Sequence, residues 1–222
     1  MHQKITYDLL IHPFFTLAVA PVTHEQELDI ISEDSFQLSR MWAKHISLLK
    51  NDPTRGLIIL SPNFKSRIGR MDILSRSIAS GLISLKENSH LNSRGMYVRK
   101  AALFKAMADF DSMVQLARKF LGDRVIVVSG KKNAFQKKLS LLKLGQSKGK
   151  KLGLSMGEYY DSCVNSYSRI FTELTGQRVR RSKERSFAGS SISFGATDKA
   201  TVSWPKISSG RVKNVLGRKP RR

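Results

Sequence analysis

The chain has 222 residues, of which 41% are hydrophobic, and 39 Lys and Arg against 17 Asp and Glu leave a formal net charge of +22 at pH 7. This hydrophobic fraction suffices for one or two packed cores, so a wholly disordered basic chain is excluded. The excess positive charge indicates a polyanionic partner, either nucleic acid or an acidic membrane surface.

The first half of the sequence alternates predicted strands and helices. Hydrophobic periodicity predicts a strand over 4–11, a helix over 35–50, a strand over 57–60 and a second strand near 70–74. The strands are assigned from alternating or continuous runs of apolar residues. The helix is assigned from apolar residues that recur three and four positions apart.

The pattern continues as far as residue 129. An apolar, helix-like stretch covers 78–85, a strong amphipathic pattern predicts a helix over 98–121, and a β-branched run at 124–129 predicts a buried strand. Because strands and helices interleave in a small unit, residues 1–129 are predicted to form an α+β domain of the ferredoxin-like kind.

His45 is the most informative residue of this half. Leu38, Met41, Trp42 and Leu49 share its face of the predicted helix, because their spacing gives one amphipathic stripe. A titratable imidazole on the inward face of a helix can be a buried general base. The alternative is a core histidine hydrogen-bonded to backbone, and from this stretch alone the alternative is the better interpretation.

The positive charge is concentrated in the second half. Residues 1–64 are close to balanced, whereas 131–151 carry eight lysines and no acid. Residues 178–185 carry five bases and one acid, and the tail over 206–222 carries seven bases and no acid. The polyanion is therefore expected to contact mainly the second half.

A lysine-rich helix is predicted over 131–143. Phe135, Leu139 and Leu142 share one face, while lysines occupy other positions. A helix anchored in this way can lie in the groove of folded RNA or along DNA phosphates. The alternative is a solvated surface helix, but such a helix usually mixes charges of both signs, so the absence of any acid favours phosphate contact.

The remaining elements complete a predicted second region. Residues 146–153 are predicted to be a flexible basic linker, 156–174 a helix, and 185–204 a set of short strands around glycines. Residues 130–205 are therefore predicted to form an RNA-binding domain with a basic helix and closing strands, followed by the basic tail over 206–222.

Cysteine and histidine usage narrows the chemistry. Cys163 is the single cysteine, which excludes an internal disulfide and a cysteine-rich zinc site. The five histidines show no metal-ligand spacing, so we expect no metal and no cofactor. The apolar stretch at 14–22 lacks the clean core of a signal peptide, and no segment is long enough to span a membrane, which predicts a cytoplasmic location.

Three segments occur in a recognisable order along the chain. They are 43–77, which contains His45 and the S-P-N-F and S-R-I-G sequences, the tetrapeptide Leu174-Thr175-Gly176-Gln177, and ISFGATDKATVSWP at 192–205. Together they resemble the CRISPR repeat-processing endoribonucleases of the type I-F kind, over about half of the chain. Lys131-Lys132-Asn133 and the basic helix stand where that family has an arginine-rich helix.

The resemblance implies a metal-independent RNase of a prokaryotic cytoplasm. Such an enzyme cuts CRISPR precursor RNA at the base of the repeat stem-loop by 2′-OH attack, leaves a 2′,3′-cyclic phosphate, and often stays bound to the guide RNA within a multisubunit ribonucleoprotein complex. By position, His45 matches the catalytic histidine, Thr172 the hydroxyl residue that holds the ribose, and Phe194 an aromatic residue packed near the imidazole. An imidazole suits this proton transfer, because its ordinary pKa is close to working pH.

The resemblance and the charge pattern also imply a set of RNA-binding residues. The set consists of Lys131, Lys132, Asn133, Lys137, Lys138, Thr175, Gln177, Arg178, Arg180 and Arg181. The chain departs from the family pattern at Phe194, where the family commonly has Tyr, and at Leu174, where it has serine. Lysines also replace most arginines of the basic helix, which favours phosphate contact over bidentate reading of bases.

Two other classes of protein fit the composition. A non-catalytic nucleic-acid-binding protein, of the nucleocapsid or architectural type, explains the charge, the basic tail and the size equally well. A peripheral membrane protein would need a basic amphipathic helix with a bulky aromatic face, and the helix over 131–143 has only Phe135.

Overall fold

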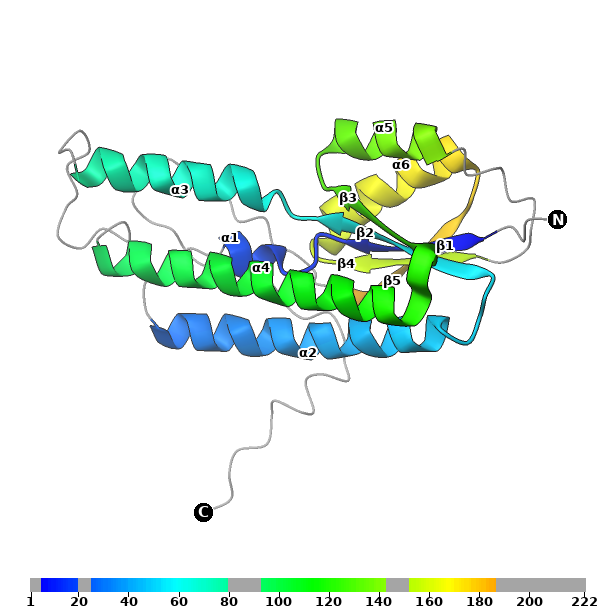
Figure 1. Cartoon of the computed structure of the whole chain (residues 1–222), viewed down its shortest axis with the longest axis horizontal. Helices are drawn as coiled ribbons and strands as arrows, with labels where there is room; N and C mark the ends of the chain where they lie inside the picture. The colour runs from blue at the N-terminus through cyan, green and yellow to red at the C-terminus, as the bar shows by residue number, and fades with distance from the viewer. Residues whose placement is uncertain (1–4, 20–24, 80–92, 143–151, 187–222) are drawn as a thin grey trace, which may run out of the picture.

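The computed structural model describes residues 5–19, 25–79, 93–142 and 152–186 (Figure 1). Phe194, the strands predicted beyond 186, most of the linker predicted over 146–153 and the tail over 206–222 lie outside the described residues.

A five-stranded parallel sheet forms the centre of the molecule. Its spatial order is β3-β2-β1-β4-β5, and every pair of neighbours runs parallel. The strands are β1 (Thr6–Ile11), β2 (Arg55–Ser61), β3 (Val125–Ser129), β4 (Gly153–Gly157) and β5 (Val179–Ser186).

Helices cover both faces of this sheet (Figure 1). On one face lie α1, α2 and α4, with α3 packed against α4, whereas α5 and α6 cover the other face. The helices are α1 (Phe15–Val19), α2 (Glu25–Leu49), α3 (Phe64–Ala79), α4 (Ser93–Leu121), α5 (Lys132–Leu142) and α6 (Asn165–Thr175). A 3-10 turn, η1 (Gly122–Arg124), precedes β3, and a π-helical turn, η2 (Tyr160–Val164), precedes α6.

The central strands are buried on both faces, which explains their continuous apolar sequences. In β1, Leu10 packs towards α2 and α4, while Leu9 and Ile11 pack towards α5 and α6. In β2, Ile59 and Leu60 divide between the two faces in the same way. The sheet therefore separates two hydrophobic cores.

Several predicted elements are confirmed, one predicted strand is wrong and one strand was missed. The strands predicted over 4–11, 57–60 and 124–129 are present. Residues 70–74, predicted as a strand, lie inside α3. The short strand β4 was missed, because its five residues, GLSMG, show neither period clearly and follow a run of lysines.

The predicted helices are confirmed with different ends. Helix α2 starts at Glu25 rather than at 35, and α4 starts at Ser93 rather than at 98. The helix predicted over 131–143 is α5. The helix predicted over 156–174 begins only after β4, as η2 followed by α6.

The mixed helix and strand content is confirmed, but a ferredoxin-like arrangement is not. That arrangement has an antiparallel sheet, whereas all pairs in this sheet are parallel. Strands from both sides of residue 129 join the same sheet, because β4 pairs with the central strand β1.

The strand order creates a switch point at the centre of the sheet. From β1 the chain moves outward to β2 and β3 on one side, and it then returns through α5 to place β4 on the other side of β1. In open parallel sheets of this kind, ligands bind outside the carboxyl ends of the two strands at which the order reverses. Those strands are β1 and β4.

Candidate functional site

His45 lies on α2 and is 7% exposed. Its Nε2 atom is 2.7 Å from Oδ2 of Asp8, and its Nδ1 atom is 3.1 Å from Nη1 of Arg185. A guanidinium can only donate, so Nδ1 accepts from Arg185 and the ring hydrogen on Nε2 is donated to Asp8. Both nitrogens of the imidazole are therefore engaged by groups of the protein.

Asp8 connects this histidine to the rest of the sheet. Its side chain is fully buried on β1, and it also accepts from the Arg55 guanidinium and, at 2.7 Å, from the backbone N–H of Leu154. The indole N–H of Trp42 donates to the carbonyl of Arg185 at 2.9 Å. The network ties α2 to β1, β2, β4 and β5, which indicates a structural role for His45.

The other residues implied by the resemblance lie elsewhere. Thr172 is on α6, which covers the opposite face of the sheet from α2 (Figure 1). Phe194 lies outside the described residues. The structure therefore does not bring His45 and Thr172 together.

The Thr-Gly-Gln segment ends helix α6. Thr175 is the last residue of α6, Gly176 adopts a left-handed conformation with φ 67°, and its N–H is bonded to the carbonyl of Thr172. The Gln177 side chain accepts from the N–H of Tyr7 and donates to the carbonyl of Ile5, each at 3.1 Å. Gln177 therefore fixes the end of α6 to β1, while the Thr175 hydroxyl donates to the carbonyl of Phe171 and accepts from the N–H of Gln177.

Helix α5 has the arrangement that its sequence predicts. Phe135 is 0% exposed and Leu139 is 2% exposed, so the helix is anchored in the core below it. Four exposed lysines form what we call the lysine face: Lys131, Lys132, Lys137 and Lys138, with exposed Asn133 between them. Within the described part of the chain, no carboxylate forms an ion pair with any of these lysines.

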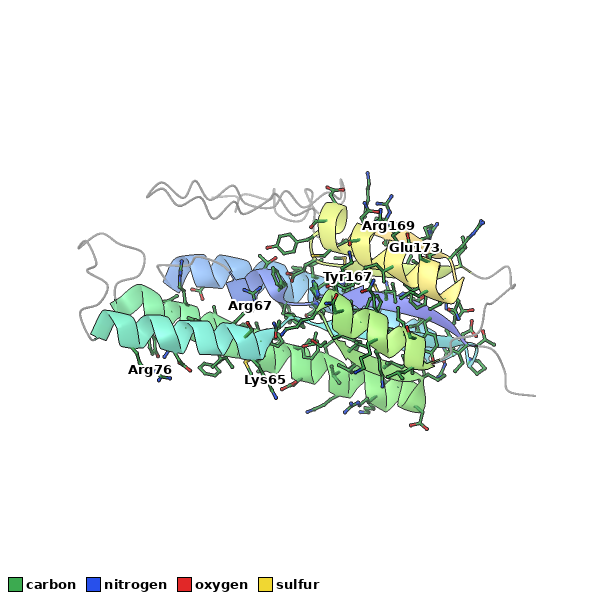
Figure 2. The ribbon with its side chains drawn as sticks, turned by 90° about the horizontal axis from the view of Figure 1, so that it is seen from above. Lys65, Arg67, Arg76, Tyr167, Arg169 and Glu173 are labelled. Carbon is green, nitrogen blue, oxygen red and sulfur yellow. The ribbon has the colours of Figure 1, made fainter. Side chains whose placement is uncertain are left out.

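The predicted arginines lie on a different element. Arg178 precedes β5, and Arg180 and Arg181 are exposed on this edge strand. Helix α6 contacts both α5 and β5, and its exposed surface carries an ion pair between Arg169 and Glu173, at 3.4 Å (Figure 2). The arginines and the lysine face therefore belong to separate parts of the surface.

A second group of unusual residues follows β1 and β4, at the switch point. Three non-glycine residues of the described chain have positive φ: His12 (49°), Phe14 (64°) and Tyr159 (58°). Non-glycine residues rarely adopt this conformation, and such strain concentrates at functional sites. All three lie directly after the two strands where a parallel sheet binds ligands.

Glu158 is the fully buried carboxyl group of this region. Its Oε2 atom accepts from the N–H of Thr16, and hydrogen bonding to the segment after β1 acts to lower its pKa. Burial nevertheless dominates and raises the pKa of Glu158 to about 7. Its Oε1 atom has no hydrogen-bond partner among the described residues.

His12 is 7% exposed and faces the loop that follows β3. Its Nε2 atom is 3.2 Å from the carbonyl oxygen of Gly130, so Nε2 carries the hydrogen and Nδ1 is an acceptor. Burial lowers the pKa of His12 to about 4, which keeps the ring neutral at pH 7. Its Nδ1 atom has no partner among the described residues.

Aromatic and basic groups surround these two residues. The Phe15 ring lies 5.7 Å from the His12 ring and 5.1 Å from the Tyr159 ring, measured between centroids. The Arg67 guanidinium carbon lies 4.4 Å from the centroid of Phe15. Burial is the main cause that raises the pKa of Tyr159 to about 12.

Two glycines make the close packing of the strand ends feasible. A Cβ atom on Gly130 would lie 2.3 Å from Nε2 of His12, and one on Gly157 would lie 2.0 Å from the carbonyl oxygen of Ile11. Gly157 also has φ +140°, which side-chain-bearing residues rarely adopt. The backbone at this site therefore requires glycine at both positions.

We call His12, Phe15, Arg67, Glu158 and Tyr159 the switch-point site. No local pattern predicts this site, because its members come from three separate segments of the chain, which follow β1, β2 and β4. The one local signal was a histidine followed by proline at the end of an apolar strand. Only the strand order brings Glu158 beside the loop after β1.

The described residues contain neither a metal cluster nor a membrane-spanning helix. No cluster of three or more His, Cys, Asp or Glu side chains able to hold a metal ion is found there. No helix in that part of the chain has the length and apolar character needed to cross a membrane. Comparisons of the chain with protein-family models, curated proteins and solved structures give no match.

Proposed function

We propose that the protein binds nucleic acid, with RNA as the first ligand to test, through the lysine face of α5. The observation that carries this proposal is the contrast between the buried and the exposed side chains of α5. Phe135 and Leu139 are fully buried, whereas all four lysines are exposed and have no carboxylate partner within the described residues.

The physical argument concerns the cost of gathering like charges. Four lysines around one short helix repel one another, and a protein without a polyanionic partner gains nothing from that arrangement. A phosphate backbone turns the repulsion into attraction and releases its own counterions on binding. The net charge of +22 acts in the same direction and speeds encounter with a polyanion.

The exposed arginines at β5 are a second contact region in this proposal. Arg178 and Arg180 are exposed at the edge of the sheet, on the other side of α6 from α5. A nucleic acid that reaches both regions would have to cross α6. Thr175 and Gln177 are left out of the proposal, because their side chains hold the end of α6.

Cleavage of CRISPR precursor RNA stays a prediction that rests on the resemblance alone. For His45 to accept a proton from a ribose hydroxyl, Arg185 would first have to leave its Nδ1 atom. Thr172 would have to act from the opposite face of the sheet. Binding is the part of the hypothesis that the arrangement of residues supports.

One experiment tests both parts. The full chain is mixed with a labelled CRISPR repeat stem-loop in EDTA. RNA binding and the chemical ends of any cleavage products are measured on the same samples. We expect saturable binding that weakens strongly in Lys137→Glu/Lys138→Glu. The matched control is Lys44→Glu/Lys119→Glu, which makes the same change of charge on exposed positions of α2 and α4.

The two outcomes that matter are distinct. Equal weakening by both double variants would contradict a dedicated lysine face and indicate a diffuse field. A single cut with a 2′,3′-cyclic phosphate end, lost in His45→Ala with binding retained, would add catalysis to the proposal. Binding without a cut would leave the protein as a non-catalytic nucleic-acid-binding protein.

A further inference from the structure

We infer that two copies of this chain associate through the outer edge of β3 and the adjoining side of α4. Three features of the molecule support this association: an apolar sheet edge, an uncovered side of one helix, and charges that become complementary across a two-fold axis. The association is independent of the proposed RNA binding, because neither β3 nor α4 carries the lysine face.

The two edges of the sheet differ in charge. Strand β3 has the sequence VIVVS, and among the described strands it pairs only with β2. Three of its side chains, Val125, Ile126 and Val127, are partly exposed. Strand β5, at the other edge, has the sequence VRRSKERS. Charged residues on an edge strand oppose pairing with another chain, whereas an uncharged apolar edge favours it, so the edge of β3 is the one suited to a further strand.

A second copy of β3 can pair with this edge antiparallel, about a two-fold axis. If all five residues of each strand pair, Val127 lies at the axis, and Val125 lies opposite Ser129 of the other copy. The sheet then continues from one copy into the other. Both α4 helices lie on one face of this joint sheet, and both α5 helices lie on the opposite face.

Helix α4 has an uncovered side next to the β3 edge. It contacts β2 and β3, whereas α2 contacts β5 at the far edge, so the side of α4 away from α2 faces the β3 edge. Helix α3 covers this side only as far as Phe110, whose ring centroid lies 5.6 Å from that of Phe64, the first residue of α3. From Phe64, α3 extends away from the sheet beside the first half of α4 (Figure 1), where Lys100 pairs with Asp72 at 3.3 Å. Beyond Phe110, α3 leaves that side of α4 uncovered.

Asp111 and Arg118 are exposed charged residues on this uncovered side. Steps of three and four residues connect both to Lys100, so they share the face of α4 that α3 covers further back. Within the described part of the chain, neither side chain forms an ion pair. They stand about 10 Å apart along α4 at 1.5 Å per residue, so they do not neutralise each other.

A two-fold axis pairs these charges between copies. Two antiparallel α4 helices place Asp111 of one copy opposite Arg118 of the other, twice, when the axis passes midway between the two residues. That midpoint lies about 10 Å before Leu121, the end of α4. Val127 lies about 7 Å along β3 from its first residue. Because α4 and β3 run in opposite directions from η1, one axis fits both the strand pairing and the charge pairing.

The ends of β3 carry a second complementary pair. Exposed Asp123 precedes the strand, and exposed Lys131 follows it. Antiparallel pairing brings the start of one strand beside the end of the other, so these opposite charges approach each other at both ends. An unrelated strand would not require either charge arrangement, which favours a second copy as the partner. Lys131 also belongs to the lysine face, so the test uses Asp111 and Arg118.

The test is sedimentation velocity of the nuclease-treated full chain over a range of concentrations. We expect an equilibrium between monomer and dimer. Arg118→Asp should raise the dissociation constant at least about tenfold, because the two-fold axis turns two attractive contacts into two repulsive ones. Asp111→Arg should have the same effect for the same reason. The control is Lys119→Asp, at the next exposed position of α4, because adjacent residues of a helix lie on different faces.

Mixing the two single variants gives the decisive result. Neither Asp111→Arg nor Arg118→Asp should form a dimer with itself at concentrations where the parent does. An equal mixture should form a heterodimer, because both contacts between the two variants again join opposite charges. A fluorescent label on one variant reports the heterodimer. A mixture that stays monomeric would overturn the inference.

Two further variants separate the parts of the surface. Val127→Lys places two like charges beside the axis and should also prevent association. If circular dichroism shows that this variant is unfolded, the exposed charge variants carry the test. Lys137→Glu/Lys138→Glu should form the dimer as the parent does, even where RNA binding is lost. The inference also fails if the parent is monomeric throughout the concentration range, or if Lys119→Asp weakens the dimer as much as Arg118→Asp.

Discussion

The imidazole of His45 on α2 lies 2.7 Å from the carboxylate of Asp8 on β1, and this contact joins a 25-residue helix to the central strand. Asp8 is fully buried and also accepts hydrogen bonds from the Arg55 guanidinium and from the backbone N–H of Leu154. A buried carboxylate with this many partners stabilises the fold only while the partners remain.

Removal of Asp8 should therefore destabilise the protein strongly. Asp8→Ala leaves Arg55 and His45 without their shared acceptor, and breaking a buried charged pair typically costs about 3–5 kcal/mol. His45→Ala should cost less, about 1–3 kcal/mol, because it removes one bond to a charged group and leaves Asp8 with two others. Urea unfolding of both variants checks the order, and an Asp8→Ala protein as stable as the parent would contradict it.

Glu158 should make stability depend on pH in one direction. Its pKa is raised by burial from 4.5 to about 7 in the folded protein, so the folded state binds more protons than the unfolded state between these values. Stability from this group is fully present below about pH 4.5 and is lost as pH rises through about 7.

The Glu158→Gln variant isolates this effect. Between pH 5 and pH 8, the parent should lose stability relative to the variant by an amount on the order of 2–3 kcal/mol. Denaturant unfolding at several pH values measures the difference between the two proteins. A difference that stays constant over this range would show that Glu158 keeps an ordinary pKa.

His12 should contribute the opposite dependence. Burial lowers its pKa from 6.5 to about 4, so the unfolded state binds more protons between these values and stability rises with pH over that range. His12→Gln should therefore flatten the acid side of the stability profile, and His45→Gln is the matched comparison. A profile that keeps its slope between pH 4 and pH 6.5 in His12→Gln would contradict a buried neutral His12.

Phe135 should be required for the lysine face to exist as a rigid surface. Its side chain is fully buried and its ring lies 5.4 Å from that of Tyr167. Phe135→Ala should cost about 3–5 kcal/mol, because it leaves a cavity below α5. The substitution should also weaken RNA binding. Leu141→Ala, at an exposed position of the same helix, is the control and should change stability by less than about 0.5 kcal/mol.

Helices and strands were predictable from the sequence where a periodic hydrophobic pattern extended over many residues or a run of residues was strongly apolar. Helices α2, α4 and α5 and strands β1, β2 and β3 carry such patterns, and each was found. Strand direction and order have no local pattern, because they depend on pairings between distant segments. The short strand β4, which decides the position of the switch point, was missed because its five residues show no clear period.

The candidate site shows the same limit at the level of single residues. The spacing on α2 correctly predicted that His45 faces inward, but its partners Asp8 and Arg185 lie 37 and 140 positions away. His12 and Glu158 belong to different loops, and only their neighbours across the sheet make them unusual. The lysine face was predictable, because its residues and its anchors all lie on α5 or directly before it.

The salt dependence of RNA binding tests the lysine face most directly. Each phosphate contact contributes slightly less than one unit to the slope of log affinity against log salt. Lys137→Gln/Lys138→Gln should therefore lower that slope by about 1.4 to 1.8 units, and Lys44→Gln/Lys119→Gln should leave it unchanged. Equal slopes for the parent and both double variants would contradict nucleic-acid binding through α5.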